Sequence, residues 1–169
     1  MSTGRKPSGT SVLGLTASSD PAGAAERPSI ETARRRLGGR ATAPSQRAPG
    51  SLVQVKLHGA ARTKGVLLWA TDRHCDVWFE DGIARRARFD VVTPYPGLAP
   101  DGLVRVAGEM RLFTSLAEGE RVRWERASEV AEGCIVEKCR YGAIIVSRDG
   151  RVVAVGFRKL WPAVVHGTA

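Results

Sequence analysis

The sequence predicts an all-β protein with two small five-stranded barrels in tandem, preceded by a disordered basic N-terminal tail. Three observations lead to this prediction. One stretch of the chain occurs twice, at residues 53–94 and 122–162, and a shift of 68 positions aligns most of the two copies. In each copy, short runs of alternating apolar and polar residues indicate strands. Each copy also contains an Asp-Gly pair, which predicts a tight hairpin because glycine takes the positive φ of such turns.

The repeat is recognised by its aligned residues. The loop before the first glycine differs by one residue between the copies, and the apolar positions after it follow the same plan. A repeated β unit of this size predicts two related domains, each near the lower limit for independent folding, which would stabilise each other by packing. The aligned pairs are Gly65 with Gly133, Gly82 with Gly150, Phe89 with Phe157 and Pro94 with Pro162.

Residues 1–50 form the predicted tail. They lack aromatic residues and contain eight Lys and Arg against three acidic residues, so few large apolar groups can offset the entropy of ordering. One short helix is compatible with residues 30–38. Its arginines, Arg34, Arg35 and Arg36, are either phosphate contacts or part of a solvated linker. The Ser-rich, acid-free first 19 residues leave a transit peptide open as an alternative.

Residues 51–97 form the first predicted barrel. We expect three strands at 52–57, 66–70 and 75–80, a fourth strand that ends at about residue 89, and a short last strand before Pro94. If Val66 and Leu68 face inward on one strand, Trp69 and Trp78 face outward from two neighbouring strands.

The outward tryptophans have two interpretations. Trp69 and Trp78 could lie side by side as an exposed stacking or partner-binding face, since exposed aromatic pairs mark interaction surfaces. Alternatively, this face packs against the second barrel inside the molecule. The sequence leaves both interpretations open.

The second barrel is predicted at residues 119–169, after a linker at 98–118. Alternating apolar residues between 103 and 113 favour an extra hairpin in the linker, turning at Ala107-Gly108. By alignment with the first copy, Cys134 and Val136 are expected in the core of the second barrel, together with Val122, Trp124, Ala143, Ile145, Val153, Val155, Phe157 and Leu160.

The order of these elements resembles SH3-like small barrels of the Tudor/KOW type. The resemblance covers both copies and is most Tudor-like at the FEDG segment, residues 79–82. It implies binding of nucleic acid, peptides or neighbouring proteins, without catalysis. Phe79 and Asp81 match positions of the aromatic cage with which Tudor domains read methylated side chains, a cation–π device. Ile83 and Ser147 stand where further rings are needed, so the resemblance disfavours a methyl-mark reader.

The charge favours an anionic partner. Lys and Arg exceed Asp and Glu by nine, which suits nucleic acid or an acidic protein surface, and leaves binding to an anionic membrane surface as a less favoured alternative. Guanidinium groups are well matched to phosphate, although interleaved acids also fit a plain solvated surface. The candidate nucleic-acid contacts are Arg34, Arg35, Arg36, Lys64, Arg85, Arg86 and Arg88.

Other classes of function find no support in the sequence. The three cysteines form no CxxC pair, which favours a reducing compartment such as the cytoplasm, or a nucleoid or organelle interior. His74 and Cys75 lack the further ligands that zinc needs. We therefore expect no metal, no cofactor, no transmembrane segment and no catalytic constellation. The leading hypothesis is a nucleic-acid-associated binding protein, and membership of a larger complex is compatible with it. The alternative is an adaptor that recruits a protein through the Trp69/Trp78 face.

Overall fold

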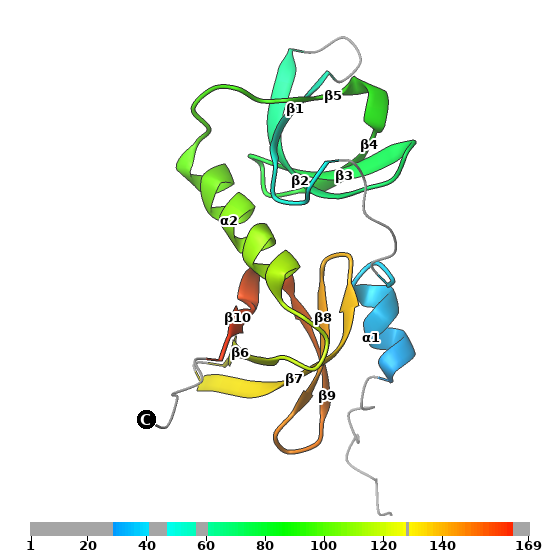
Figure 1. The fold of residues 1–169 in the computed structure, drawn as a ribbon, viewed down its shortest axis with the longest axis vertical. Helices are drawn as coiled ribbons and strands as arrows, with labels where there is room; N and C mark the ends of the chain where they lie inside the picture. Colours follow the sequence, from blue (N-terminus) through cyan, green and yellow to red (C-terminus); the bar gives the residue numbers. More distant parts are fainter. Residues whose placement is uncertain (1–28, 41–46, 57–60, 128, 164–169) are drawn as a thin grey trace, which may run out of the picture.

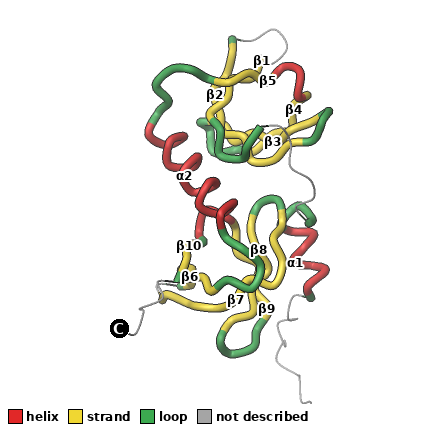
Figure 2. Tube along the Cα trace, in the orientation of Figure 1, coloured by secondary structure: helices red, strands yellow, loops and turns green. Residues whose placement is uncertain are grey.

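The computed structural model describes residues 29–40, 47–56, 61–127 and 129–163. In these residues the chain forms two five-stranded antiparallel sheets, one short helix beside the second sheet and a longer helix between the sheets (Figure 1). Figure 2 shows that strands and short turns make up both sheet regions. The predicted all-β class with two tandem five-stranded units is confirmed.

The first barrel has the strand order β4-β3-β2-β1-β5. Its own core includes Val53, Val55, Leu67, Val77 and Phe79. Its strands are β1 Leu52–Lys56, β2 Arg62–Ala70, β3 His74–Phe79, β4 Ala84–Arg88 and β5 Val92–Pro94, with the 3-10 turn η1 Phe89–Val91 before β5.

The second barrel repeats this arrangement, with the order β10-β6-β7-β8-β9. Leu67 pairs with Val77 in the first barrel, and Ile135 pairs with Ile145 at the same place in the second. Each long strand has an irregularity directly after that pair, so the duplication extends to the β-bulge. The elements are β6 Arg121–Arg126, β7 Glu129–Cys139, β8 Gly142–Ser147, β9 Val152–Gly156, η2 Phe157–Lys159 and β10 Trp161–Pro162.

The predicted inward set on the long strand is wrong by one residue in both copies. Leu67 and Ile135 lie in the barrel cores, whereas Cys134 and Val136 are exposed. The cause is a run of consecutive apolar residues from 66 to 69, in which alternation alone does not define which residues face the barrel core.

The linker is a helix, so the predicted hairpin is wrong. Helix α2, Asp101–Ser115, buries Leu103, Val106, Met110 and Phe113 on one face. These residues recur at helical spacing, while Val104, which belonged to the alternating set, is exposed. Lys138 Nζ donates to the carbonyl oxygen atoms of Thr114 and Leu116 at the C-terminal end of α2, where a cation is favoured.

The space between the barrels is filled by one continuous apolar cluster. Val66 and Leu68 project from β2 into this cluster, where they join Val106 of α2 and Phe157 and Leu160 of the second barrel. The two barrels and α2 therefore share a core, which explains why the linker is rich in large apolar residues.

A short helix from the predicted tail packs on the second barrel. Helix α1, Ile30–Arg36, is capped at its N-terminus by Ser29, whose side chain accepts a hydrogen bond from the Thr32 N–H. Ala33 and Leu37 are buried with Cys139 and Ile144 on the outer face of β7 and β8 (Figure 1). The segment proposed as a transit peptide lies outside the described residues.

An ion pair holds α1 to the barrel. The Arg34 guanidinium donates to both carboxylate oxygens of Glu137, at 2.8 and 2.7 Å. Glu137 is only 7% exposed, and the hydrogen bond from Arg34 lowers the pKa of its carboxyl group. Burial of Ala33 and this forked contact together fix the helix against the sheet.

We expect Glu137→Gln to release α1. The amide cannot form the ion pair, so trypsin should cleave after Arg35 and Arg36 several-fold faster than in the unmodified protein. The matched control is Glu31→Gln, which alters the exposed second partner of Arg34 and should leave cleavage unchanged. Equal cleavage rates in both variants and the unmodified protein would contradict a role for the ion pair.

The same contact predicts a pH dependence. Because the pKa of Glu137 is lowered in the folded chain, its contribution is complete above the ordinary carboxyl pKa and disappears as the pH falls through the lowered value. The protection factors of the α1 amides, which are exchange rates corrected for the intrinsic effect of pH, should fall over that acidic range, and by less in Glu137→Gln.

Candidate functional site

The two predicted tryptophans lie on the face of the first barrel that packs against the second. Trp69 pairs with Asp76 and Trp78 pairs with Val66, so the two rings are not directly opposite each other. The Arg140 guanidinium stacks 3.9 Å from the centroid of the Trp69 ring, and Trp78 meets the ring of Phe157 edge-on at 6.5 Å. Both rings therefore contact side chains of the second barrel, as the internal interpretation expects, and both remain partly exposed.

Polar contacts complete this interface between the barrels. The Tyr141 hydroxyl donates to Asp76 Oδ2 at 2.5 Å, and Arg86 Nε donates to Asp76 Oδ1 at 3.1 Å. Burial, followed by the hydrogen bond with Asp76, raises the pKa of the Tyr141 phenol, which therefore stays a donor. The backbone N–H groups of Arg140 and Tyr141 donate to Gly39 and Leu37, so the segment after α1 supports the turn that docks on the first barrel.

Most of the predicted phosphate-contacting residues already have partners. Arg85 pairs with Asp81, Arg86 with Asp76, and Arg88 with Asp90. Alternation along β4 also divides these arginines, because Arg85 lies on the inward side opposite Val77 while its neighbours point outward. Lys64 lies over the Tyr95 ring, and Arg34 is held by Glu137. Of the predicted set, Arg35 and Arg36 have no acidic partner among the described residues.

The structure also bears on the positions that resemble an aromatic cage. Phe79 is 1% exposed, in the core of the first barrel, and the Arg85 guanidinium lies over its ring at 5.5 Å. The Phe79 ring is therefore not free to enclose a methylated cation at the mouth of its barrel.

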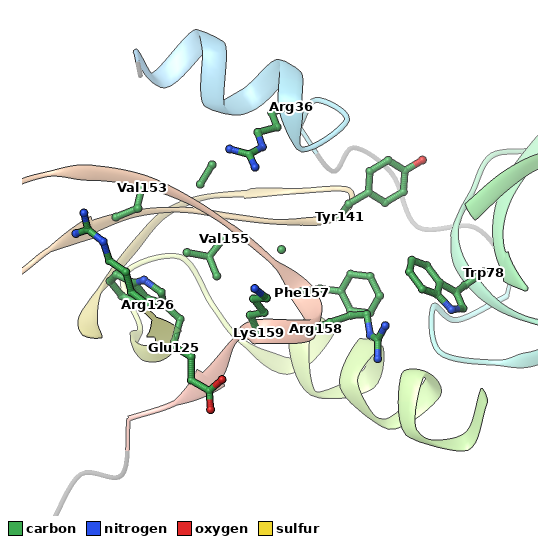
Figure 3. A pocket seen from close by; sticks show the side chains of 13 residues that line it. Arg36, Trp78, Glu125, Arg126, Tyr141, Val153, Val155, Phe157, Arg158 and Lys159 are labelled. Carbon is green, nitrogen blue, oxygen red and sulfur yellow. The ribbon is translucent and has the colours of Figure 1, made fainter. Parts of the chain in front are cut away.

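A cavity of about 510 Å³ lies between α1, the second barrel and Trp78 of the first (Figure 3). Its floor is apolar and is built by side chains of β6, β9 and η2. Three of these are almost fully buried, namely Trp124, Val155 and Phe157. Half-exposed Val153 completes the floor, and the Tyr141 and Trp78 rings lie at the end nearest the first barrel.

The rim of the cavity is basic. Arg36 comes from α1, Arg126 from the end of β6 and Lys159 from η2. All three are exposed, and none has a carboxylate partner among the described residues. Arg158 also lines the cavity, but it pairs with Glu109 at 2.7 Å and lies over Trp78. Glu125 supplies the one carboxylate among the residues that line the cavity.

One wall of the cavity is an open strand edge. Strand β9 is the last strand of its sheet and pairs only with β8. Hydrogen bonds from Ser147 N to Arg151 O and from Phe157 N to Tyr141 O bracket the β8–β9 ladder. By alternation, the N–H and C=O groups of Ala154 and Gly156 point away from β8, toward the open edge. The cavity thus combines apolar surface, backbone hydrogen-bonding groups and unpaired positive charge.

Sequence reasoning placed Trp124 and Val153 in the core and did not single out Arg126, Tyr141 or Lys159 as site residues. A signal was present in the repeat. Trp124 stands where the first copy has Val55, and Val153 stands where it has Arg85. These two exchanges place a large ring and an apolar side chain along the cavity of the second copy only.

Among the residues that the structure describes, no group of three or more His, Cys, Asp or Glu side chains could hold a metal ion. Neither helix in that part of the chain is long and apolar enough to cross a membrane.

Comparisons with known proteins give a likeness of fold. No protein family and no curated protein matches the chain. Among solved structures, the chain is similar to the crystal structure of ADCP1 tandem Agenet domain 3-4, with 14% sequence identity and a TM-score of 0.28. The match covers 81% of this chain and 90% of that chain.

Proposed function

We propose that this protein is a non-enzymatic binding module for nucleic acid and that the cavity of the second barrel is its central contact. One observation carries the proposal: Arg36, Arg126 and Lys159 surround an apolar floor without acidic partners. Three unpaired cations at one opening favour a polyanion, because each phosphate that they neutralise releases counterions.

The other basic residues extend this contact in the proposal. The chain carries a net charge of +9, and Arg35 lies next to Arg36 on α1. Lys64, Arg85, Arg86 and Arg88 supply at most weak peripheral contacts, since phosphate would compete with the aromatic or acidic partners that they already have.

The proposal predicts a loss of affinity and of salt dependence on removing two rim charges. In the full-length double variant Arg126→Ala and Lys159→Ala, affinity for a fluorescent single-stranded decamer should fall about tenfold at low salt. The slope of log affinity against log salt should shrink by about 1.4, since each lost phosphate contact on a single strand removes about 0.7. Fluorescence anisotropy at several salt concentrations measures both quantities.

The matched control removes an Arg and a Lys elsewhere. Arg62 and Lys56 are exposed, lie in the first barrel and do not line the cavity. The double variant Arg62→Ala and Lys56→Ala should keep the affinity within about threefold. Equal losses in the two double variants would place the contact outside the cavity. Absence of binding at low salt would overturn the proposal, and salt-tolerant capture of an acidic peptide would favour an adaptor instead.

A further inference from the structure

We infer that the cavity takes one unstacked base of a single strand, so that the protein prefers single-stranded nucleic acid to a duplex. The inference rests on the proposed function and adds the form of nucleic acid that the cavity admits.

A ligand that fills this cavity must present both an anion and an apolar group. The rim cations Arg36, Arg126 and Lys159 surround a floor made by Trp124 and Phe157, which are 3% and 4% exposed. In a duplex the base faces are stacked inside the helix, so the phosphates could reach the rim while the floor remained unfilled. In a single strand a base can leave the stack and enter the cavity, while its flanking phosphates stay at the rim.

The open edge of β9 supports a base over a purely apolar group. Ala154 and Gly156 direct backbone N–H and C=O groups away from β8, along the wall of the cavity. Nucleobases carry donors and acceptors around the ring edge and apolar faces above and below the ring. The backbone groups of β9 on one wall match the donors and acceptors of a base, and the apolar floor matches its ring faces.

Three parts of the chain must come together to form this site. Arg36 comes from α1 and Trp78 from the first barrel, while the second barrel supplies the floor and Tyr141 (Figure 3). Tyr141 is itself tied to both neighbours, by its backbone to Leu37 and by its hydroxyl to Asp76. Trp78 and Tyr141 therefore border the cavity as half-exposed rings, placed for contact with a base.

The test uses the full-length protein and four probes at one low salt concentration. These are an oligothymidylate decamer, a decamer of the same backbone with abasic residues, a ten-base-pair duplex and thymidine monophosphate. We expect the oligothymidylate to bind about tenfold tighter than the abasic decamer or the duplex, which is in the range of one stacked base. The mononucleotide should bind far more weakly, because it reaches fewer rim cations.

A filling variant tests whether the preference arises in the cavity. Val153→Phe should lower the affinity for oligothymidylate toward that for the abasic decamer and leave the abasic decamer unaffected. Val130→Phe is the matched control, because Val130 is 61% exposed on β7 and does not line the cavity. Circular dichroism checks that both variants fold. If Val153→Phe does not fold, the comparison of oligothymidylate with the abasic decamer in the unmodified protein still tests the inference.

The outcomes separate this inference from the proposed function. Salt-dependent binding with equal affinity for the abasic decamer, or for the duplex, overturns the inference and keeps the function. A mononucleotide that binds as tightly as the decamer also overturns it. A lack of salt-dependent binding to every oligonucleotide, or equally tight binding of a Glu decapeptide, overturns both.

Discussion

Replacing Gly142 by alanine is expected to lower the free energy of unfolding by about 3 kcal/mol. Gly142 begins β8, directly opposite Gly156 of β9. A Cβ atom there would lie 2.1 Å from the Val155 carbonyl oxygen and 2.8 Å from the Gly156 Cα atom. Both are backbone atoms of the neighbouring strand, so relief requires the two strands to separate next to Tyr141 and the cavity.

Urea denaturation measures this loss, and a second glycine supplies the control. Gly108 lies inside α2 and has no atom within 4 Å of the position of an added Cβ. Gly108→Ala should raise the free energy of unfolding by about 0.5–1 kcal/mol, since alanine favours the helix. The two substitutions add the same methyl group and should act in opposite directions. A neutral Gly142→Ala would show that β8 and β9 do not approach this closely.

Replacing Asp76 by alanine is expected to cost about 2–3 kcal/mol. Asp76 is 4% exposed and accepts hydrogen bonds from Tyr141 of the second barrel and Arg86 of the first. Its removal leaves a half-buried hydroxyl and a guanidinium without their acceptor at the contact between the barrels. The loss should therefore include part of the free energy that holds the barrels together.

Another Asp–Arg pair of the first barrel provides the comparison. Asp90 pairs with Arg88 at 2.6 Å, but both side chains are more than half exposed. Asp90→Ala should cost less than about 0.5 kcal/mol, because solvent screens the pair. Urea denaturation of the two variants under the same conditions checks the difference. Equal effects would mean that Asp76 contributes no more than a surface carboxylate.

The strands could be predicted from local pattern. Asp81-Gly82 and Asp149-Gly150 indicated hairpins, and both glycines have the positive φ that such turns need, at +78° and +76°. The alignment of Gly65 with Gly133 agrees with the strand pairing. Gly65 pairs with Phe79 and Gly133 pairs with Ser147, which are equivalent positions on the third strands of the two barrels. These features depend on residues close in the chain, so alternation and turn chemistry were enough.

Local pattern did not predict which side chains of β2 face the barrel core, or that the linker is a helix. Val66 and Leu68 are apolar because a helix and a second barrel cover the outer face of β2, so a strand that is buried on both sides loses its alternation. In the linker the alternating set and the helical set overlap at Val106 and Met110, so the local pattern alone did not separate a hairpin from a helix. The buried face of α2 identifies the helical period as the correct one.

The sequence by itself determined the duplication, the strand and turn positions and the excess of positive charge, because each of these is written in residue types and short spacings. Only the tertiary structure decided which charges are free and which rings are covered. Arg34 and Arg36 are near neighbours in one basic run, yet the first is held by Glu137, more than a hundred residues away, and the second reaches the cavity without an acidic partner. Pairing between distant side chains depends on how the barrels and α1 pack, which no local pattern encodes.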